Sequence, residues 1–107
     1  MGQKGDKMTS ASTVLAERLI AVFDSIGGIT HKKMFGGYGF FFDGKMFGIV
    51  DSKGKAFLKV DEDLKAKYVA RGAEQHSRMP YYSLPENVLE NEADIIEWAR
   101  KSIELVG

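Results

Sequence analysis

The stretch "MFGGYGFFFDGKMFGIV", residues 34–50, holds five of the chain's twelve glycines and five of its seven phenylalanines. Asp43 and Gly44 stand at its centre. This pair is typical of two-residue β-hairpin turns, because both central positions of the turn need a positive φ. The residues on either side are largely aromatic and apolar, as in strands. The stretch therefore predicts a hairpin that reverses at Asp43-Gly44.

Counting outward from this turn predicts which side chains share a face of the sheet, with Phe40 opposite Phe47. A second hairpin through "DSKG", residues 51–54, then returns the chain as residues 55–60. One face must be covered by helices and consists of Tyr38, Phe40, Phe42, Phe47, Ile49, Ala56, Leu58 and Val60. The reverse face combines apolar side chains, glycines and lysines. It consists of Gly39, Phe41, Met46, Gly48 and Phe57, flanked by Lys55 and Lys59.

The same glycines admit a second interpretation, a phosphate-binding loop. Gly39 and Gly44-Lys45 have the spacing at which such a loop begins, but Met46 stands where Ser or Thr would ligate magnesium. A phosphate-binding loop also leads into a helix N-terminus, whereas residues 40–42 are three phenylalanines that read as strand. The pattern favours the hairpin, in which Gly44 serves the turn.

Helical patterns flank these strands. Apolar residues recur at three- and four-residue steps over residues 12–25, and Gly27-Gly28 ends that helix. A short helix follows Asp61, and a last helix starts near Asn91. A brief strand is expected at residues 80–83, where the proline suggests a sheet edge.

These elements predict an α+β fold in a single domain. Its centre is a mostly antiparallel sheet, a hairpin meander, packed by N- and C-terminal helices. Residues 1–11 are polar and are expected to form a flexible leader, with the domain proper at residues 12–107.

Composition excludes several function classes. The chain has 107 residues, no cysteine and equal numbers of acidic and basic side chains. Without cysteine there is no disulfide, thiolate nucleophile or Cys-ligated zinc. Zero net charge disfavours an autonomous DNA-binding protein, because phosphate neutralisation supplies most of the affinity of such proteins. No apolar run is long enough to span a bilayer, so we do not expect a membrane protein. The absence of cysteine suits a cytoplasmic location, which is the one we expect.

No catalytic constellation emerges from the motifs. His31 and His76 are far apart in the sequence and have no acidic residue at ligand spacing. Neither Ser77 nor Ser83 lies in a nucleophile elbow. We therefore expect that the protein is not an enzyme and that it binds neither a metal ion nor a cofactor.

What remains is a candidate interaction surface on the reverse face of the sheet. It comprises Phe41, Met46, Phe57, Lys55 and Lys59, joined by Met34 and Tyr81. Mixed apolar and basic surface of this kind is typical of protein interfaces, so the expected partner is a protein, with a homodimer as one form. Two alternatives stay open: nucleic-acid contact through Lys32, Lys33, Lys55 and Lys59, and a small-ligand or enzymatic role.

The order of the motifs resembles a known family. "MFGGYG" at residues 34–39 is followed by "DGK" at 43–45, "LKVD" at 58–61, "MPY" at 79–81 and "WA" at 98–99. This series resembles the N-terminal domain of the TfoX (Sxy) family, bacterial regulators of natural competence. The resemblance implies an α+β domain linked to transcriptional regulation of DNA uptake, and it transfers no catalytic residues. Full-length members carry a second, helical domain, for which 107 residues leave no room, so a stand-alone N-terminal domain is expected.

Overall fold

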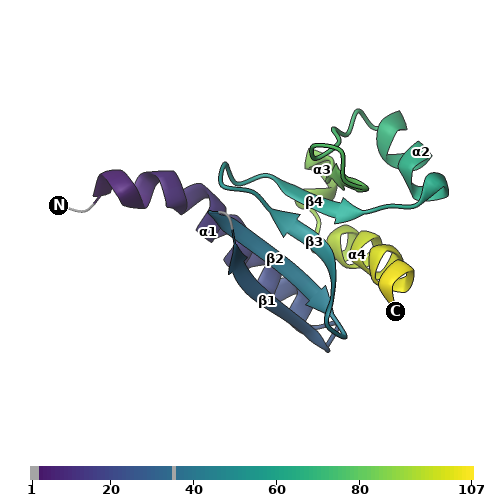
Figure 1. Ribbon diagram of the computed structural model, residues 1–107, viewed down its shortest axis with the longest axis horizontal. Coiled ribbons are helices and arrows are strands. Elements are labelled where there is room, and N and C mark those ends of the chain that lie inside the picture. The colour runs from purple at the N-terminus through teal and green to yellow at the C-terminus, as the bar shows by residue number, and fades with distance from the viewer. Residues whose placement is uncertain (1–2, 35) are drawn as a thin grey trace.

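The computed structural model describes residues 3–34 and 36–107, with side chains from residue 12 onward (Figure 1). Helices and strands alternate in blocks along the described chain. In order they are α1 (Gln3–Asp24), β1 (Ile29–Met34), β2 (Gly37–Phe42), β3 (Lys45–Val50), β4 (Ala56–Lys59), α2 (Glu62–Ala70), β5 (Tyr81–Ser83), α3 (Glu86–Leu89) and α4 (Glu92–Val106).

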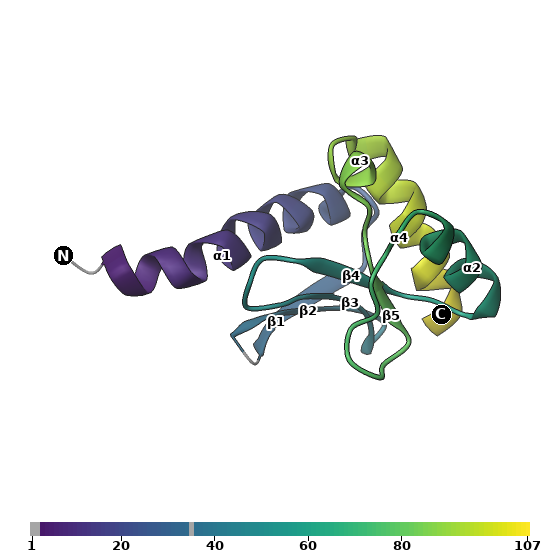
Figure 2. The ribbon, with the colours of Figure 1, turned by 90° about the horizontal axis from the view of Figure 1, so that it is seen from above.

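The strands form one antiparallel sheet in the order β1-β2-β3-β4-β5. The turns between β1, β2, β3 and β4 are short, whereas α2 and a loop separate β4 from β5. Each strand still pairs with its neighbours in the sequence. Figure 2 shows α1 and α4 on one face of this sheet, while the loop between α2 and β5 passes over part of the other. The structure therefore confirms the predicted α+β fold, with a hairpin meander packed by the terminal helices.

The predicted turn between β2 and β3 is present. Phe42 pairs with Lys45 across it, and Asp43 and Gly44 have φ values of 53° and 78°. Both residues thus occupy the left-handed region, which aspartate tolerates and glycine adopts without strain. The chemistry of two residues is enough to locate this reversal.

A β-bulge at Phe47 changes the register beyond the turn. Phe41 pairs with Met46 as predicted, but Phe40 pairs with Gly48 and not with Phe47. Two residues of β3 therefore oppose one residue of β2, which is the definition of a bulge. Both Phe40 and Phe47 nevertheless face the core, with 1% and 0% of their surface exposed.

The bulge moves Ile49 to the other side of the sheet. Ile49 was expected on the helix-covered face, but it pairs with Gly39 and is only half-buried. Val50 takes the inward position instead and is fully buried. One extra residue in β3 is sufficient for this exchange, because side chains alternate between faces along a strand.

The second hairpin closes one residue later than predicted. Ala56 pairs with Val50, and the amide of Asp51 donates to the carbonyl of Lys55 at 2.9 Å. The connecting loop therefore spans three residues and ends in Gly54, whose φ is 83°. This shift offsets the bulge, so Ala56 still faces the core as predicted.

Aromatic side chains fill the space between the sheet and the helices. Phe23 of α1 packs edge-on against Phe40, with ring centroids 5.2 Å apart, and lies 5.5 Å from Phe47. Tyr68 of α2 packs against Trp98 of α4 with centroids 4.6 Å apart. Of the residues predicted to face inward, those buried are Phe40, Phe47, Ala56, Leu58 and Val60, while Tyr38 and Phe42 are half-buried against them.

The helix ends follow the expected signals with one difference. Asp61 caps α2 by accepting from the amide of Leu64, and Asn91 caps α4 in the same way. Gly27 and Gly28, both with positive φ, follow the end of α1. However, α1 begins at Gln3 and not at residue 12, so the segment expected as a leader has a helical backbone. Its flexibility stays a prediction.

Candidate protein-binding surface on the sheet

The part of the sheet that faces away from the helices has a glycine at its centre. Gly39 lies between β1 and β3, where a side chain would collide with its neighbours. A Cβ atom there would lie 2.8 Å from the Sδ of Met34 and 3.2 Å from the Sδ of Met46. Phe41 would be equally close, at 3.2 Å. The absence of a side chain at Gly39 thus lets two methionines and a phenylalanine gather over one point of the sheet.

A groove opens beside this cluster, with a volume of about 350 Å³. Its walls come from β1, β3, the loop after β3, and the loop between α2 and β5. The lining residues are Met34, Met46, Ile49, Val50, Asp51, Ser52, His76 and Met79. Met79 is 38% exposed, so this rim of the groove presents apolar surface to solvent. Methionine is flexible and polarisable, and it recurs at surfaces that accept varied partners.

The cluster around Gly39 is built from the "MFGGYG" block and the strands around it. This block is one of the motifs on which the resemblance to a family depends. A model of the TfoX N-terminal domain family matches residues 21–105. The chain belongs to this family. No curated protein sequence matches the chain. The match confirms the expected resemblance and marks the chain as a domain of the competence-regulator type.

In this TfoX N-terminal domain, the loop between α2 and β5 covers two of the residues predicted to form the surface. Phe57 is 5% exposed because the ring of His76 packs on it, with centroids 4.6 Å apart. Tyr81 is also 5% exposed, and its hydroxyl donates to the carbonyl oxygen of Met46 at 2.9 Å. Burial raises the pKa of Tyr81. The prediction that Phe57 and Tyr81 present exposed surface is therefore wrong, because both side chains are buried.

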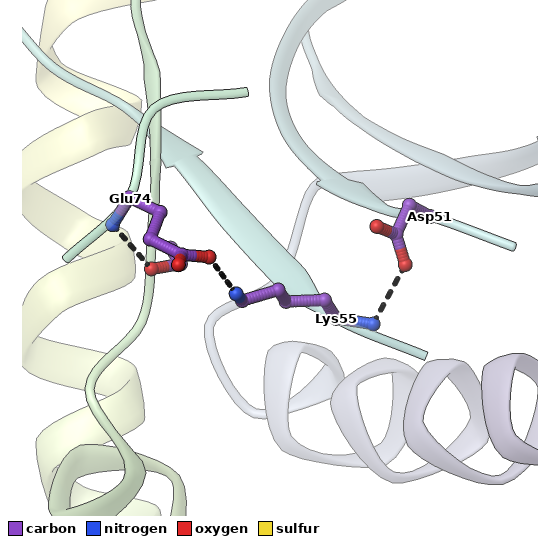
Figure 3. A network of polar contacts seen from close by, with 4 residues as sticks. Asp51, Lys55 and Glu74 are labelled. Carbon is purple, nitrogen blue, oxygen red and sulfur yellow. Dashed lines mark hydrogen bonds and ion pairs between the residues drawn. The ribbon is translucent and has the colours of Figure 1, made fainter. Parts of the chain in front are cut away.

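The two lysines predicted for the surface lie apart from the methionine cluster. Lys55 forms an ion pair with Glu74, and its amide donates to the carboxylate of Asp51 at 2.8 Å (Figure 3). The amide of Glu74 in turn donates to the Ser83 hydroxyl at 2.9 Å. Lys55 lowers the pKa of the Glu74 carboxyl through this pair. The network ties the loop after β3 to the segment after α2, so Lys55 has a structural partner already.

The second lysine, Lys59, sits on an inner strand of the sheet. It is half-buried on β4, where it pairs with Tyr81 of β5. Of the seven residues predicted, the structure thus brings together Met34, Phe41 and Met46 around Gly39. The other four belong to the covered half of the same face or to its margin.

Sequence reasoning missed most of the residues that line the groove, among them Ile49, His76 and Met79. Ile49 escaped because the bulge at Phe47 cannot be seen in an alternating apolar pattern. His76 and Met79 escaped because they lie in an irregular loop that returns over the sheet. The only signal for the loop was the proline at position 80 before a short strand, which indicated an edge and not a cover.

The described part of the chain offers little support for a metal site or a membrane-spanning helix. No group of three or more potential metal ligands occurs among the described residues. His31 lies on β1, whereas His76 packs on Phe57. Among the helices that the structure describes, none combines the length and the apolar character needed to cross a membrane.

Proposed function

We propose that this TfoX N-terminal domain is a non-enzymatic regulatory or adaptor domain that acts by protein–protein contact in the regulation of DNA uptake. The observation that carries the proposal is the methionine-lined groove on the helix-free face of the sheet. An apolar hollow of this kind suits the side chains of a partner protein.

The composition of the groove supports binding and not catalysis. Three methionines and Ile49 supply most of its apolar lining, and its polar lining consists of Asp51, Ser52 and His76. A catalytic pocket would need a nucleophile and a base that converge on one point. Here the ring of His76 packs on Phe57, and the Asp51 carboxylate accepts two backbone amides of its own loop.

The shifted pKa values also have structural explanations. Perturbed groups are expected at active sites, where burial and charge serve the chemistry. Here burial accounts for Tyr68 and Tyr81, and the ion pair with Lys55 accounts for Glu74.

A second candidate function is nucleic-acid contact in transcriptional regulation. Lys32 and Lys33 are adjacent and exposed on β1, which favours it. Lys55 and Lys59 do not extend that patch, since one is paired with Glu74 and the other is half-buried. Fluorescence anisotropy with duplex and single-stranded DNA separates the candidates. Affinity that rises steeply as salt falls would favour nucleic acid.

The test of the proposed function compares two exposed apolar residues. Met79 is 38% exposed at the groove and Val69 is 51% exposed on α2. In cells deleted for the gene, complementation with Met79→Asp is expected to leave transcript profiles and DNA uptake as in the deletion. Complementation with Val69→Asp is expected to restore both, because it makes the same chemical change away from the groove.

The comparison has a clear failing outcome. If Met79→Asp is folded by circular dichroism and regulates as well as the wild type, the groove is not the working surface. If the deletion itself changes neither transcripts nor DNA uptake, the regulatory role is wrong.

A further inference from the structure

The two edges of the sheet differ in whether they are free to pair. At the β5 edge, the segment of residues 74–76 already pairs with the strand. The amide of Ser83 donates to the carbonyl of Glu74 at 2.9 Å, and the amide of His76 donates to that of Tyr81 at 2.8 Å. At the other edge, β1 pairs with β2 alone (Figure 1). Within the described residues, β1 is thus the open edge.

The side chains of β1 are exposed and carry one sign of charge. Its four inner residues are exposed: Thr30, His31, Lys32 and Lys33. The strand contains no carboxylate, and neither does its neighbour β2. An edge strand has unpaired amide and carbonyl groups along its length, and these are the groups to which another strand adds.

Two hollows flank β1, one on each face of the sheet. The first has a volume of about 250 Å³ and is lined by Thr30, His31, Lys32, Phe41 and Gly44. Thr30 pairs with Phe41 and Lys32 with Gly39, so most of this hollow lies on the helix-free face.

The second hollow lies on the face covered by the helices. It has a volume of about 400 Å³ and is lined by Ser12, Thr13, Lys33, Met34, Gly36, Gly37 and Tyr38. Lys33 pairs with Tyr38 there, and Ser12 and Thr13 come from α1. Successive side chains of an added strand would point to alternate faces and could enter the two hollows in turn.

We propose that the β1 edge binds an extended, acidic segment of a partner protein as a sixth strand. This deepens the proposed function, on which it rests, by naming the kind of partner. Glutamate or aspartate side chains would pair with Lys32 and Lys33, which stand on opposite faces. The partner's backbone would supply the amide and carbonyl groups that complete the edge.

The observations favour this occupant over two others. A second copy of the chain, added antiparallel, would bring its own Lys32 and Lys33 against the first pair, and like charges on neighbouring strands are destabilising. Nucleic acid would satisfy the charges, but phosphate oxygens only accept hydrogen bonds and would leave the carbonyl groups of β1 unpaired.

The probe for the test is a capped synthetic peptide that repeats two glutamates followed by two valines, so that adjacent glutamates point to opposite faces of the sheet. Titrated into ¹⁵N-labelled protein, it is expected to shift the amide resonances of residues 29–34 more than those elsewhere. The same peptide with every backbone nitrogen methylated keeps its carboxylates but lacks N–H donors. It is expected to lose this binding.

Charge variants provide the matched comparison. Lys32→Glu with Lys33→Glu is expected to weaken peptide binding by about tenfold, since two exposed ion pairs become repulsive. The control, Lys53→Glu with Lys65→Glu, changes two exposed lysines elsewhere by the same charge and is expected to leave binding within about twofold. A lysine–valine peptide should bind the β1 variant more tightly than the wild type.

Four results would overturn the inference: no shift at β1, equal binding of the methylated peptide, stronger occupation of β1 by duplex or single-stranded DNA, or a self-associated β1 edge in sedimentation equilibrium. Each leaves the proposed function to its own test. If β1 fails while Met79→Asp still abolishes regulation, only the strand-addition inference falls. If Met79→Asp is silent, the proposed function falls whatever β1 does.

Discussion

The phenol of Tyr68 is the largest side chain in the core with a hydroxyl that lacks a hydrogen-bond partner. Burial raises its pKa, and the nearby Ser102 lowers that pKa in part. The Ser102 hydroxyl, however, donates to the carbonyl of Lys59 at 2.8 Å and makes no hydrogen bond of regular geometry with the phenol. A buried polar group without a partner costs free energy, so Tyr68 is retained at some expense of stability.

Replacing this hydroxyl is therefore expected to be harmless. Tyr68→Phe should leave the free energy of unfolding unchanged or raise it by up to about 1 kcal/mol, as measured by urea denaturation. Tyr68→Ala, the control, should lower it by about 3 kcal/mol or more, because the ring packs against Trp98 and its loss leaves a cavity. A loss of more than about 1 kcal/mol in Tyr68→Phe would show that the hydroxyl is bonded in solution.

At the scale of elements, the sequence predicted what local chemistry decides. Asp43-Gly44 located a turn because few other pairs adopt a positive φ at both positions. The bulge at Phe47 could not be predicted, since it adds one residue to β3 without changing the apolar composition around it. Because of the bulge, Ile49 lies on the face of the candidate site, and Val50 takes its expected place on the helix-covered face. Nothing in the sequence indicated that the loop with His76 returns over the sheet. Phe57 lies on the predicted face but was expected to be exposed, whereas this loop buries it.

The ion pair of Lys55 and Glu74 joins two loops and makes the stability of that junction depend on pH. Glu74 has a lowered pKa in the folded state, so its contribution is present above the unfolded-state pKa of a glutamate. It is lost as the pH falls through the lowered folded-state pKa. The thermal midpoints of the wild type and Glu74→Gln should therefore differ slightly at about pH 7 and converge as the pH falls below the lowered folded-state pKa of Glu74.

Because both partners are exposed, the difference at neutral pH should also shrink when salt is added. Glu104→Gln, at an exposed position of α4, serves as the matched control. A gap between wild type and Glu74→Gln that widens toward acid would contradict the assignment of the pair.

At the scale of the whole molecule, Figure 2 shows that α1 extends well beyond the sheet at its N-terminal end. Among the side chains that the structure describes, from residue 12 onward, those that α1 buries belong to Ser12, Ala16, Leu19, Val22 and Phe23. The stability of the domain is thus expected to depend on the second half of the helix, where burial of apolar surface is largest.

Truncation tests this division of the helix. Removing residues 1–11 should leave the urea midpoint of unfolding unchanged, because this segment is largely polar and offers little apolar surface to bury. Removing residues 1–18 should lower the midpoint clearly, since Ala16 is lost from the core and the new helix start falls beside Leu19. If the shorter truncation already lowers the midpoint, the first turns of α1 contribute to the fold, and the domain does not begin at residue 12. If neither truncation lowers the midpoint, the packing of α1 on the sheet contributes little to the stability of the domain. The packing of α4 on the sheet would then contribute most of it.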